Sequence, residues 1–218
     1  MYPSNISLSK EILSTQVEDI LADQQIQIVV ELVGGMEPAK TFLLESMKRG
    51  KHVVTANKAL LAVHGSELFA AARKYGVNIA FEAAVGGGIP LIRALREGLI
   101  ANRIGHIYGI LNGTANYILS RMANEGTTFA EALREAQGQG IAEADPSLDV
   151  EGLDAAHKIA ILSSLAYCCE IDFNQIHIEG ISQIDPSDIQ FAKDFGYQIR
   201  LLAISRSDGE RIEVRVHP

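Results

Sequence analysis

Residues 26–33, IQIVVELV, are almost all β-branched or aliphatic. Such a nearly continuous run predicts a strand that is buried on both faces. Gly34 and Gly35 end the run, and Pro38 is well placed for the first turn of a helix that we expect to reach about Arg49. This stretch therefore predicts a strand–helix unit of the α/β type.

The alternation continues after this unit. Residues 52–55 predict a second strand, residues 58–75 a helix that Gly76 ends, and residues 77–81 a third strand. Strands and helices that alternate at this spacing predict a parallel sheet with right-handed crossovers. Ligands bind such sheets at the carboxyl ends of the strands, here residues 32–35, 55–58 and 82–88. Lys58 would place an ammonium group there, although a first-turn lysine is often simply solvated.

The pattern changes after Phe81. Residues 82–90, EAAVGGGIP, predict a glycine-rich turn that either presents its backbone to a ligand or ion, or links two domains. Strands are expected near 104–111, 175–178, 197–205 and 211–216, with a hairpin turn at 207–209. Helices are expected near 91–99, 115–124, 129–137, 153–169 and 186–195. The second half thus predicts a mixed sheet with helices on one side, and the whole chain an α/β plus α+β fold class.

The overall composition excludes several classes of protein. The 218 residues are 47% hydrophobic and 21% charged, as in ordinary globular proteins. The net charge of −8 argues against a nucleic-acid or anionic-membrane partner. No apolar run reaches the roughly 20 residues of a membrane span, and the first ten residues lack the apolar core of a signal peptide. Adjacent Cys168 and Cys169 are typical of packing residues in a reducing compartment, so we expect a cytoplasmic protein.

Residues 138–158, GQGIAEADPSLDVEGLDAAHK, place five acidic side chains ahead of a single lysine, at the start of a long apolar helix. Asp154 and Lys158 are four residues apart and therefore share one helix face. A lysine on an otherwise buried helix, opposite carboxylates, is a candidate for proton chemistry. Two plainer interpretations compete: the pair is a surface salt bridge, and Asp149 only caps the helix.

One element of a dinucleotide-binding domain is missing from the sequence. Such a domain opens with a strand and G-x-G-x-x-G within a βαβ unit of roughly 30 residues, whereas only 25 residues precede Ile26. The pair Gly138 and Gly140 does not supply this fingerprint, because Glu143 stands at the third glycine's place and a helix precedes it. The sequence therefore predicts either a truncated chain or a domain that binds no dinucleotide.

Five blocks in order along the chain resemble the homoserine dehydrogenase family. They are VVELVGG at 29–35, VVTANKALLA at 53–62, FEAAVGGGIP at 81–90, GILNGTANYIL at 109–119, and residues 140–158. The resemblance implies a partial Rossmann-like NAD(P)-binding domain at 1–84. A mixed-sheet catalytic domain, which binds substrate and dimerises, is implied at 85–218, so the chain is expected to form a homodimer or a higher homo-oligomer.

The resemblance also implies an activity and roles for individual residues. The activity is the NAD(P)-dependent interconversion of L-homoserine and L-aspartate 4-semialdehyde, a step toward threonine, methionine and isoleucine. Lys158 would exchange a proton with the substrate oxygen, and Lys58 would lie near nicotinamide and substrate. Glu143 would hold the substrate's amino group, and Asp149 and Asp154 would line the same pocket. An alkoxide formed from an aldehyde needs such an ammonium group nearby.

Further positions are implied for the cofactor and for an ion. Cofactor contacts are implied for Lys58, Leu32, Val33, Gly34 and Thr55. Main-chain oxygens at four positions would bind a monovalent cation, Na⁺ or K⁺: Glu82, Val85, Gly87 and Ile89.

The sequence also departs from the family pattern. Family members begin about one βαβ unit earlier, with G-x-G-x-x-G, and continue past Pro218. We therefore expect a fragment of the enzyme, with weak or absent binding of NAD or NADP. Two alternatives remain: a dehydrogenase of another amino acid, and a non-catalytic oligomerisation or binding module with the same fold. The presence of Lys158, Lys58 and Glu143 argues against the second.

Overall fold

The computed structural model describes residues 9–218, so residues 1–8 of the predicted nucleotide domain lie outside the described part. The chain divides into two compact units. Unit 1 comprises the chain up to Asn57 together with Ser66–Phe81, and unit 2 comprises Lys58–Gly65 together with Glu82–Pro218. The functional boundary between residues 84 and 85 stays a prediction.

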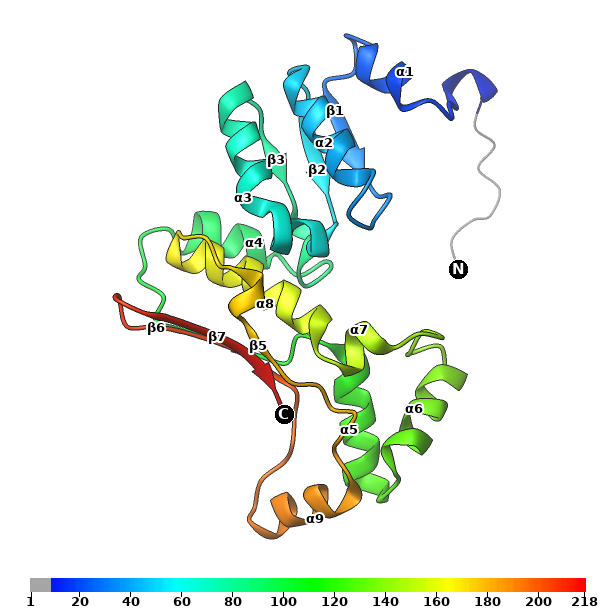
Figure 1. The fold of residues 1–218 in the computed structure, drawn as a ribbon, viewed down its shortest axis with the longest axis vertical. Helices are drawn as coiled ribbons and strands as arrows, with labels where there is room; N and C mark the ends of the chain where they lie inside the picture. Colours follow the sequence, from blue (N-terminus) through cyan, green and yellow to red (C-terminus); the bar gives the residue numbers. More distant parts are fainter. Residues whose placement is uncertain (1–8) are drawn as a thin grey trace. The chain divides into compact units, whose positions relative to one another are not determined.

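Unit 1 is built on a parallel three-stranded sheet, which confirms the predicted α/β pattern (Figure 1). The strands lie in the order β1 (Ile28–Glu31), β2 (His52–Thr55) and β3 (Ile79–Ala80). Helix α2 (Ala39–Lys48) packs against β1 and β2 and buries Leu43 and Met47. The short helices η1 (Lys10–Ile12) and α1 (Val17–Ala22) precede the sheet.

The prediction that the first strand is buried on both faces is wrong. Ile28 and Val30 are 57% and 58% exposed, whereas Glu31, on the other face, is buried. Side chains two residues apart share one face of a strand, so Ile28 and Val30 point to a face that is open to solvent. In addition, β1 lies at the edge of the sheet, where it pairs with β2 alone among the described strands. A run of β-branched residues indicates a strand but does not distinguish an edge strand from a central one.

Helix α3 (Lys58–Tyr75) contributes to both units. Its first eight residues belong to unit 2 and the remainder, from Ser66, to unit 1. Its backbone leaves helical geometry at His64, where φ is −119° and ψ is 15°. Lys58 is therefore the first helical residue and a member of unit 2.

Unit 2 contains a mixed four-stranded sheet, as predicted. The strands lie in the order β4 (His106–Gly109), β6 (Leu202–Ser207), β7 (Ile212–His217) and β5 (His177–Ile178). The β4–β6 and β6–β7 pairs are antiparallel and the β5–β7 pair is parallel. The predicted hairpin joins β6 to β7, and the carboxylate of Asp208 accepts hydrogen bonds from the backbone N–H groups of Glu210 and Arg211 in its turn.

The strand expected at 197–205 starts later than predicted, at Leu202. The preceding helix α9 (Pro186–Asp194) closes with a left-handed Gly196 at φ 78°. The N–H of Tyr197 then donates to the carbonyl of Ala192 at 2.8 Å. This helix-ending turn occupies the first residues of the predicted strand.

Unit 2 also contains several helices. In chain order they are η2 (Glu82–Ala84), α4 (Leu91–Arg93) with the π-helical η3 (Ala94–Gly98), α5 (Gly113–Glu125), α6 (Phe129–Gly138), α7 (Ser147–Val150), α8 (Leu153–Tyr167) and η4 (Phe173–Gln175), followed by α9. Helix α8 packs on the sheet face that carries the buried Ala203 and Val216 (Figure 1). Tyr108, whose side chain lies on the opposite face, is exposed.

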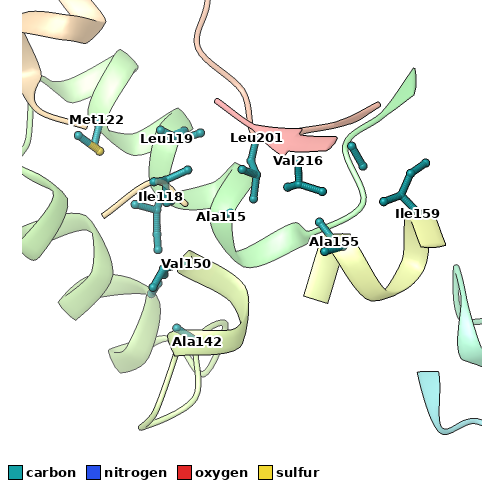
Figure 2. Close-up of a cluster of buried hydrophobic side chains, with 14 of the residues drawn as sticks. Ala115, Ile118, Leu119, Met122, Ala142, Val150, Ala155, Ile159, Leu201 and Val216 are labelled. Atoms are coloured by element: carbon teal, nitrogen blue, oxygen red, sulfur yellow. The ribbon is translucent and has the colours of Figure 1, made fainter. Parts of the chain in front are cut away.

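The main core lies between α5, α8 and the sheet. Figure 2 shows Ile118 and Leu119 of α5, Ile159 of α8 and Val216 of β7 in this cluster, and all four are fully buried. This core fixes the starts of α5 and α8, which carry the polar residues described next. Within residues 9–218, no helix combines the length and apolarity needed to cross a membrane.

Candidate active site

Helix α8 begins at a glycine that packs closely against the sheet. Gly152 is the N-cap residue and has a φ of 82°. A Cβ atom there would lie 3.2 Å from Val216 and 3.3 Å from Ile178. This close approach brings Asp154 and Lys158, in the first turns of α8, into the interior of unit 2. It also shows that Asp149 is not the cap of this helix.

Asp154 is a buried carboxylate shared by two lysines. It is 6% exposed. Its Oδ2 accepts a hydrogen bond from Lys158 Nζ at 2.6 Å, and its Oδ1 lies 3.2 Å from Lys58 Nζ. The pair at positions 154 and 158 is therefore not the surface salt bridge of the plainer interpretation. The structure brings together the two lysines predicted to act in catalysis.

Within the described part of the chain two groups accept hydrogen bonds from Lys158, which leaves one of its N–H groups for a ligand. Its ammonium group carries three donors. One is used by Asp154 and another by the main-chain oxygen of Leu111 at 2.7 Å. The side chain is 20% exposed, so solvent or a small molecule reaches it. An ammonium group fixed in this way can donate a hydrogen bond or a proton to a neighbouring ligand oxygen.

Burial and hydrogen bonding act in opposite directions on Asp154. Burial raises the pKa of this carboxyl group, but hydrogen bonds from Lys158 and Asn112, together with the charges of Lys158 and Lys58, outweigh it and hold the pKa below its ordinary value. The carboxylate is therefore ionised at neutral pH. It keeps both ammonium groups in place.

His157 is a buried neighbour that the sequence did not single out. Its ring stacks on Phe173 with 4.7 Å between the ring centroids. Burial lowers the pKa of His157, and the positive charge of Lys58 lowers it further, while Asp154 opposes the shift. The imidazole is therefore neutral at pH 7, and it adds no third cation to the pair of lysines.

The remaining predicted acids differ in their surroundings. Asp149, at the half-buried end of α7, accepts a hydrogen bond from Asn112 Nδ2 at 2.6 Å. Glu143 is exposed in the loop after α6, and Gln137 donates to its main-chain oxygen at 3.2 Å. In residues 9–218 no hydrogen bond or ion pair joins the Glu143 carboxylate to the two lysines. Its predicted contact with substrate stays a prediction.

Asn112 is a second residue that the sequence reasoning missed. It lies just before α5, and its side-chain oxygen accepts from the N–H of Ala115. Its side-chain nitrogen reaches both Asp149 and Asp154. An asparagine before a helical pattern is a recognisable cap signal, but the contact with acids about 40 residues later depends on the fold.

In unit 1 the predicted cofactor residues surround the carboxyl ends of β1 and β2. Leu32 and Val33 are exposed, and Gly34 has a φ of 77° with open space at its Cβ position. Thr55 is buried and donates to Glu31 Oε2 at 2.6 Å. An exposed apolar turn of this kind fits contact with a flat ring, so these residues fit the predicted cofactor.

Glu31 holds this turn and was also missed. Its buried Oε1 accepts hydrogen bonds from the N–H groups of Val33 and Gly34 at 2.8 and 2.9 Å. A strand-end acid between apolar residues gives no hint of this in the sequence. The carboxylate fixes the turn after β1 and links it to Thr55 on β2.

The predicted cation loop is anchored by one of its own residues. The Glu82 carboxylate accepts from the N–H groups of Ile92 and Arg93 at 3.0 and 2.9 Å, and so it caps the start of α4. Gly86 and Gly87 have φ values of 80° and 59°. The side chain of Glu82 is thus occupied, which fits main-chain rather than side-chain ligation. The ion site at Glu82, Val85, Gly87 and Ile89 stays a prediction.

Comparisons with known proteins agree with this geometry. The family model described as homoserine dehydrogenase matches residues 90–218, and the model described as homoserine dehydrogenase, NAD binding domain, matches residues 4–82. The chain belongs to the homoserine dehydrogenase family. Its two matched segments account for the two sheets: the NAD-binding segment covers the parallel one, and the homoserine dehydrogenase segment covers the mixed one.

The similar proteins carry the same family name. The homoserine dehydrogenase of Bacillus subtilis is 49% identical over 213 residues, and that of Pseudomonas aeruginosa is 51% identical over 206 residues. These alignments cover 98% and 94% of this chain, but only 49% and 48% of those proteins. The chain therefore spans about half the length of the curated relatives it matches.

Solved structures show the same relationship. The crystal structure of a homoserine dehydrogenase from Thiobacillus denitrificans matches with a TM-score of 0.91 and 53% identity, over 94% of this chain and 48% of that one. A hyperthermophilic archaeal homoserine dehydrogenase in complex with NADPH matches with a TM-score of 0.80 and 28% identity, over 94% of this chain and 59% of that one. The fold of this chain is that of the family.

Proposed function

We propose that this chain catalyses the NAD(P)-dependent interconversion of L-homoserine and L-aspartate 4-semialdehyde, in the biosynthesis of threonine, methionine and isoleucine. The observation that carries the proposal is the Lys158–Asp154–Lys58 cluster, in which one buried carboxylate holds two ammonium groups. Family membership supplies the substrate class.

The proposed reaction needs proton transfer at one oxygen atom. A bound nicotinamide dinucleotide supplies the hydride for aldehyde reduction and accepts it in the reverse direction. Lys158 directs its remaining N–H at the substrate oxygen, stabilises the negative charge that develops there, and gives up the proton; in the oxidation of the alcohol it takes the proton back. Asp154 orients the ammonium group throughout.

Acidic residues of unit 2 would recognise the substrate's amino group. That group is cationic at neutral pH and requires a carboxylate partner. We assign this role to Glu143, with Asp149 lining the same pocket. Lys58 pairs with Asp154 Oδ1, the oxygen that Lys158 does not contact, and we assign Lys58 to the nicotinamide side of the substrate.

We further propose that cofactor binding through Leu32, Val33, Gly34, Thr55 and Lys58 is weak. The 218 residues contain no G-x-G-x-x-G after a strand, and that turn normally holds the pyrophosphate at a helix N-terminus. Isothermal titration of the chain with NADPH and NADH tests this. Micromolar binding of either would contradict the proposal.

Three other properties belong to the same proposal. A homodimer or higher oligomer would form through the outer face of the mixed sheet, where Tyr108 is exposed and stacks on His106; light scattering gives the mass. A cytoplasmic location is supported by the free thiols of Cys168 and Cys169. Binding of Na⁺ or K⁺ at the main-chain site can be tested by comparing activity in chloride salts of each ion with a tetramethylammonium control.

NADP-dependent oxidation of L-homoserine, followed by absorbance, tests the central proposal. It is run on this chain and on a version extended to the length of its relatives. Lys158→Ala should lower kcat by about 10²-fold or more, because the proton donor is removed. Lys48→Ala, which removes an exposed lysine of α2, is the matched control and should leave the rate unchanged. If the extended wild type fails with homoserine but oxidises another amino-acid alcohol, the substrate assignment is wrong.

A further inference from the structure

We propose that Asn112 is a positioning residue of the active site, whose side-chain amide holds the carboxylates of Asp149 and Asp154 in a fixed relation to Lys158. The geometric part of this inference stands on the contacts of unit 2 alone. Its kinetic consequence rests on the proposed function.

Both ends of the Asn112 side-chain amide, the nitrogen and the oxygen, form hydrogen bonds. Asn112 is buried, and its Nδ2 donates to Asp149 Oδ1 at 2.6 Å and to Asp154 Oδ2 at 2.8 Å. Its Oδ1 accepts from the N–H of Ala115 at 2.8 Å. The opposite orientation would place the oxygen against two carboxylates and the NH₂ group against an N–H donor. The chemistry of the neighbours therefore fixes which way the amide points.

The same turn of chain also holds Lys158. Leu111, the residue before Asn112, accepts a hydrogen bond from Lys158 Nζ at 2.7 Å. Asp154 Oδ2 receives donors from both Lys158 and Asn112. The start of α5 therefore holds the Lys158 ammonium group in two ways. The main-chain oxygen of Leu111 binds it directly, and Asn112 acts indirectly by orienting the Asp154 carboxylate.

A neutral donor between two carboxylates serves a purpose that an acid would not. Two carboxylates close together disfavour each other's ionised form. The NH₂ group donates one hydrogen bond to each and so bridges them without adding charge. Asp149 can then face a cationic group of a ligand, while Asp154 remains paired with Lys158 and Lys58. Asn112 accordingly links the acid assigned to substrate binding with the acid beneath the proton donor.

Substitutions at position 112 separate this positioning from helix capping. Serine caps a helix about as well as asparagine, but its single hydroxyl cannot donate to both acids. Asn112→Ser therefore keeps the cap and loses the bridge, and Asn112→Asp keeps the cap and replaces the bridge by a third carboxylate. Asn112→Ala loses both. Asp185→Ser makes the same kind of cap exchange on α9 and serves as the matched control.

The first measurement is a ¹³C NMR titration of the Asp154 carboxyl carbon in the full chain. In Asn112→Ser and Asn112→Asp the midpoint should move to higher pH, because a hydrogen bond to the ionised form is lost. Asn112→Ala, which loses the cap as well as the bridge, should lower the Tm by about 2–4 °C more than Asn112→Ser does. Asp185→Ser should leave the Asp154 midpoint where it is in the wild type.

The second measurement is homoserine oxidation by the same proteins. Asn112→Ser should raise KM for homoserine and lower kcat, together reducing kcat/KM by about 10-fold or more, since one bond to each acid is lost. An unchanged Asp154 midpoint in Asn112→Ser, with KM and kcat also unchanged, would show that Asn112 is only a helix cap and would overturn the inference. If the wild type oxidises no homoserine, the proposed function fails, while the titration still decides the role of Asn112.

Discussion

Replacing Asp154 by asparagine tests whether one carboxylate holds the site together. Asp154→Asn preserves the shape of the side chain and one acceptor, but leaves Lys158 and Lys58 without their counter-charge. Removing one partner of a fully buried ion pair costs about 3–5 kcal/mol. The lysines are 20% and 38% exposed, so solvent screens part of this cost and we expect about 2–3 kcal/mol. The Tm should fall by about 4–12 °C.

Calorimetric unfolding at several pH values provides the assay. Glu97→Gln, which breaks an exposed pair with Arg93 at the same four-residue spacing, is the control and should leave the Tm unchanged. The pKa of Asp154 is lowered in the folded state, so its stabilisation is present above the unfolded value of about 3.9 and is lost as the pH falls through the folded value. The difference between wild type and Asp154→Asn should therefore shrink below about pH 4. A Tm loss at pH 7 no larger than that of Glu97→Gln would refute the reasoning.

Three further outcomes follow from the same structure. The folded-state pKa of His157 is depressed, so stability should fall as the pH drops below about 6.5, by at most about 1.4 kcal/mol per pH unit, and His157→Gln should flatten that slope in urea titrations. Gly180→Ala should lower the free energy of unfolding by about 2–3 kcal/mol, because an added Cβ would overlap the main-chain oxygen of Val150. The control Gly126→Ala, at a positive φ with open space around it, should lower the free energy of unfolding by about 1 kcal/mol. Thermal unfolding measures both. Glu31→Ala should speed hydrogen exchange of the backbone N–H groups of Val33 and Gly34, because these two groups donate hydrogen bonds to the Glu31 carboxylate. Glu31→Gln keeps an acceptor and should restore most of the protection.

The elements that the sequence predicted well are those with a local cause. Strand–helix alternation and the glycines that end helices depend on neighbouring residues, so both sheets were predicted. The pairing of Asp154 with Lys158 is likewise local, since the residues are four apart on one helix. The apolar residues around the pair favoured its burial, but a surface salt bridge stayed open as an interpretation, and the structure shows Asp154 to be buried.

The features that escaped prediction depend on distant parts of the chain. Asn112 meets acids that follow it by 37 and 42 residues, and Glu31 meets Thr55 across two strands. No spacing rule marks such contacts. The exposure of Ile28 and Val30 was missed for a related reason: the sequence of a strand does not state which neighbours it will have.

The edge position of β1 has a practical consequence for handling the protein. Among the described strands β1 pairs on one side only, and two of its outward side chains are apolar. Such an edge is a template for strands of other molecules, and aggregation of concentrated samples is the expected result. A lysine at Val30 would introduce charge on that edge, where natural proteins often place it to prevent intermolecular strand pairing.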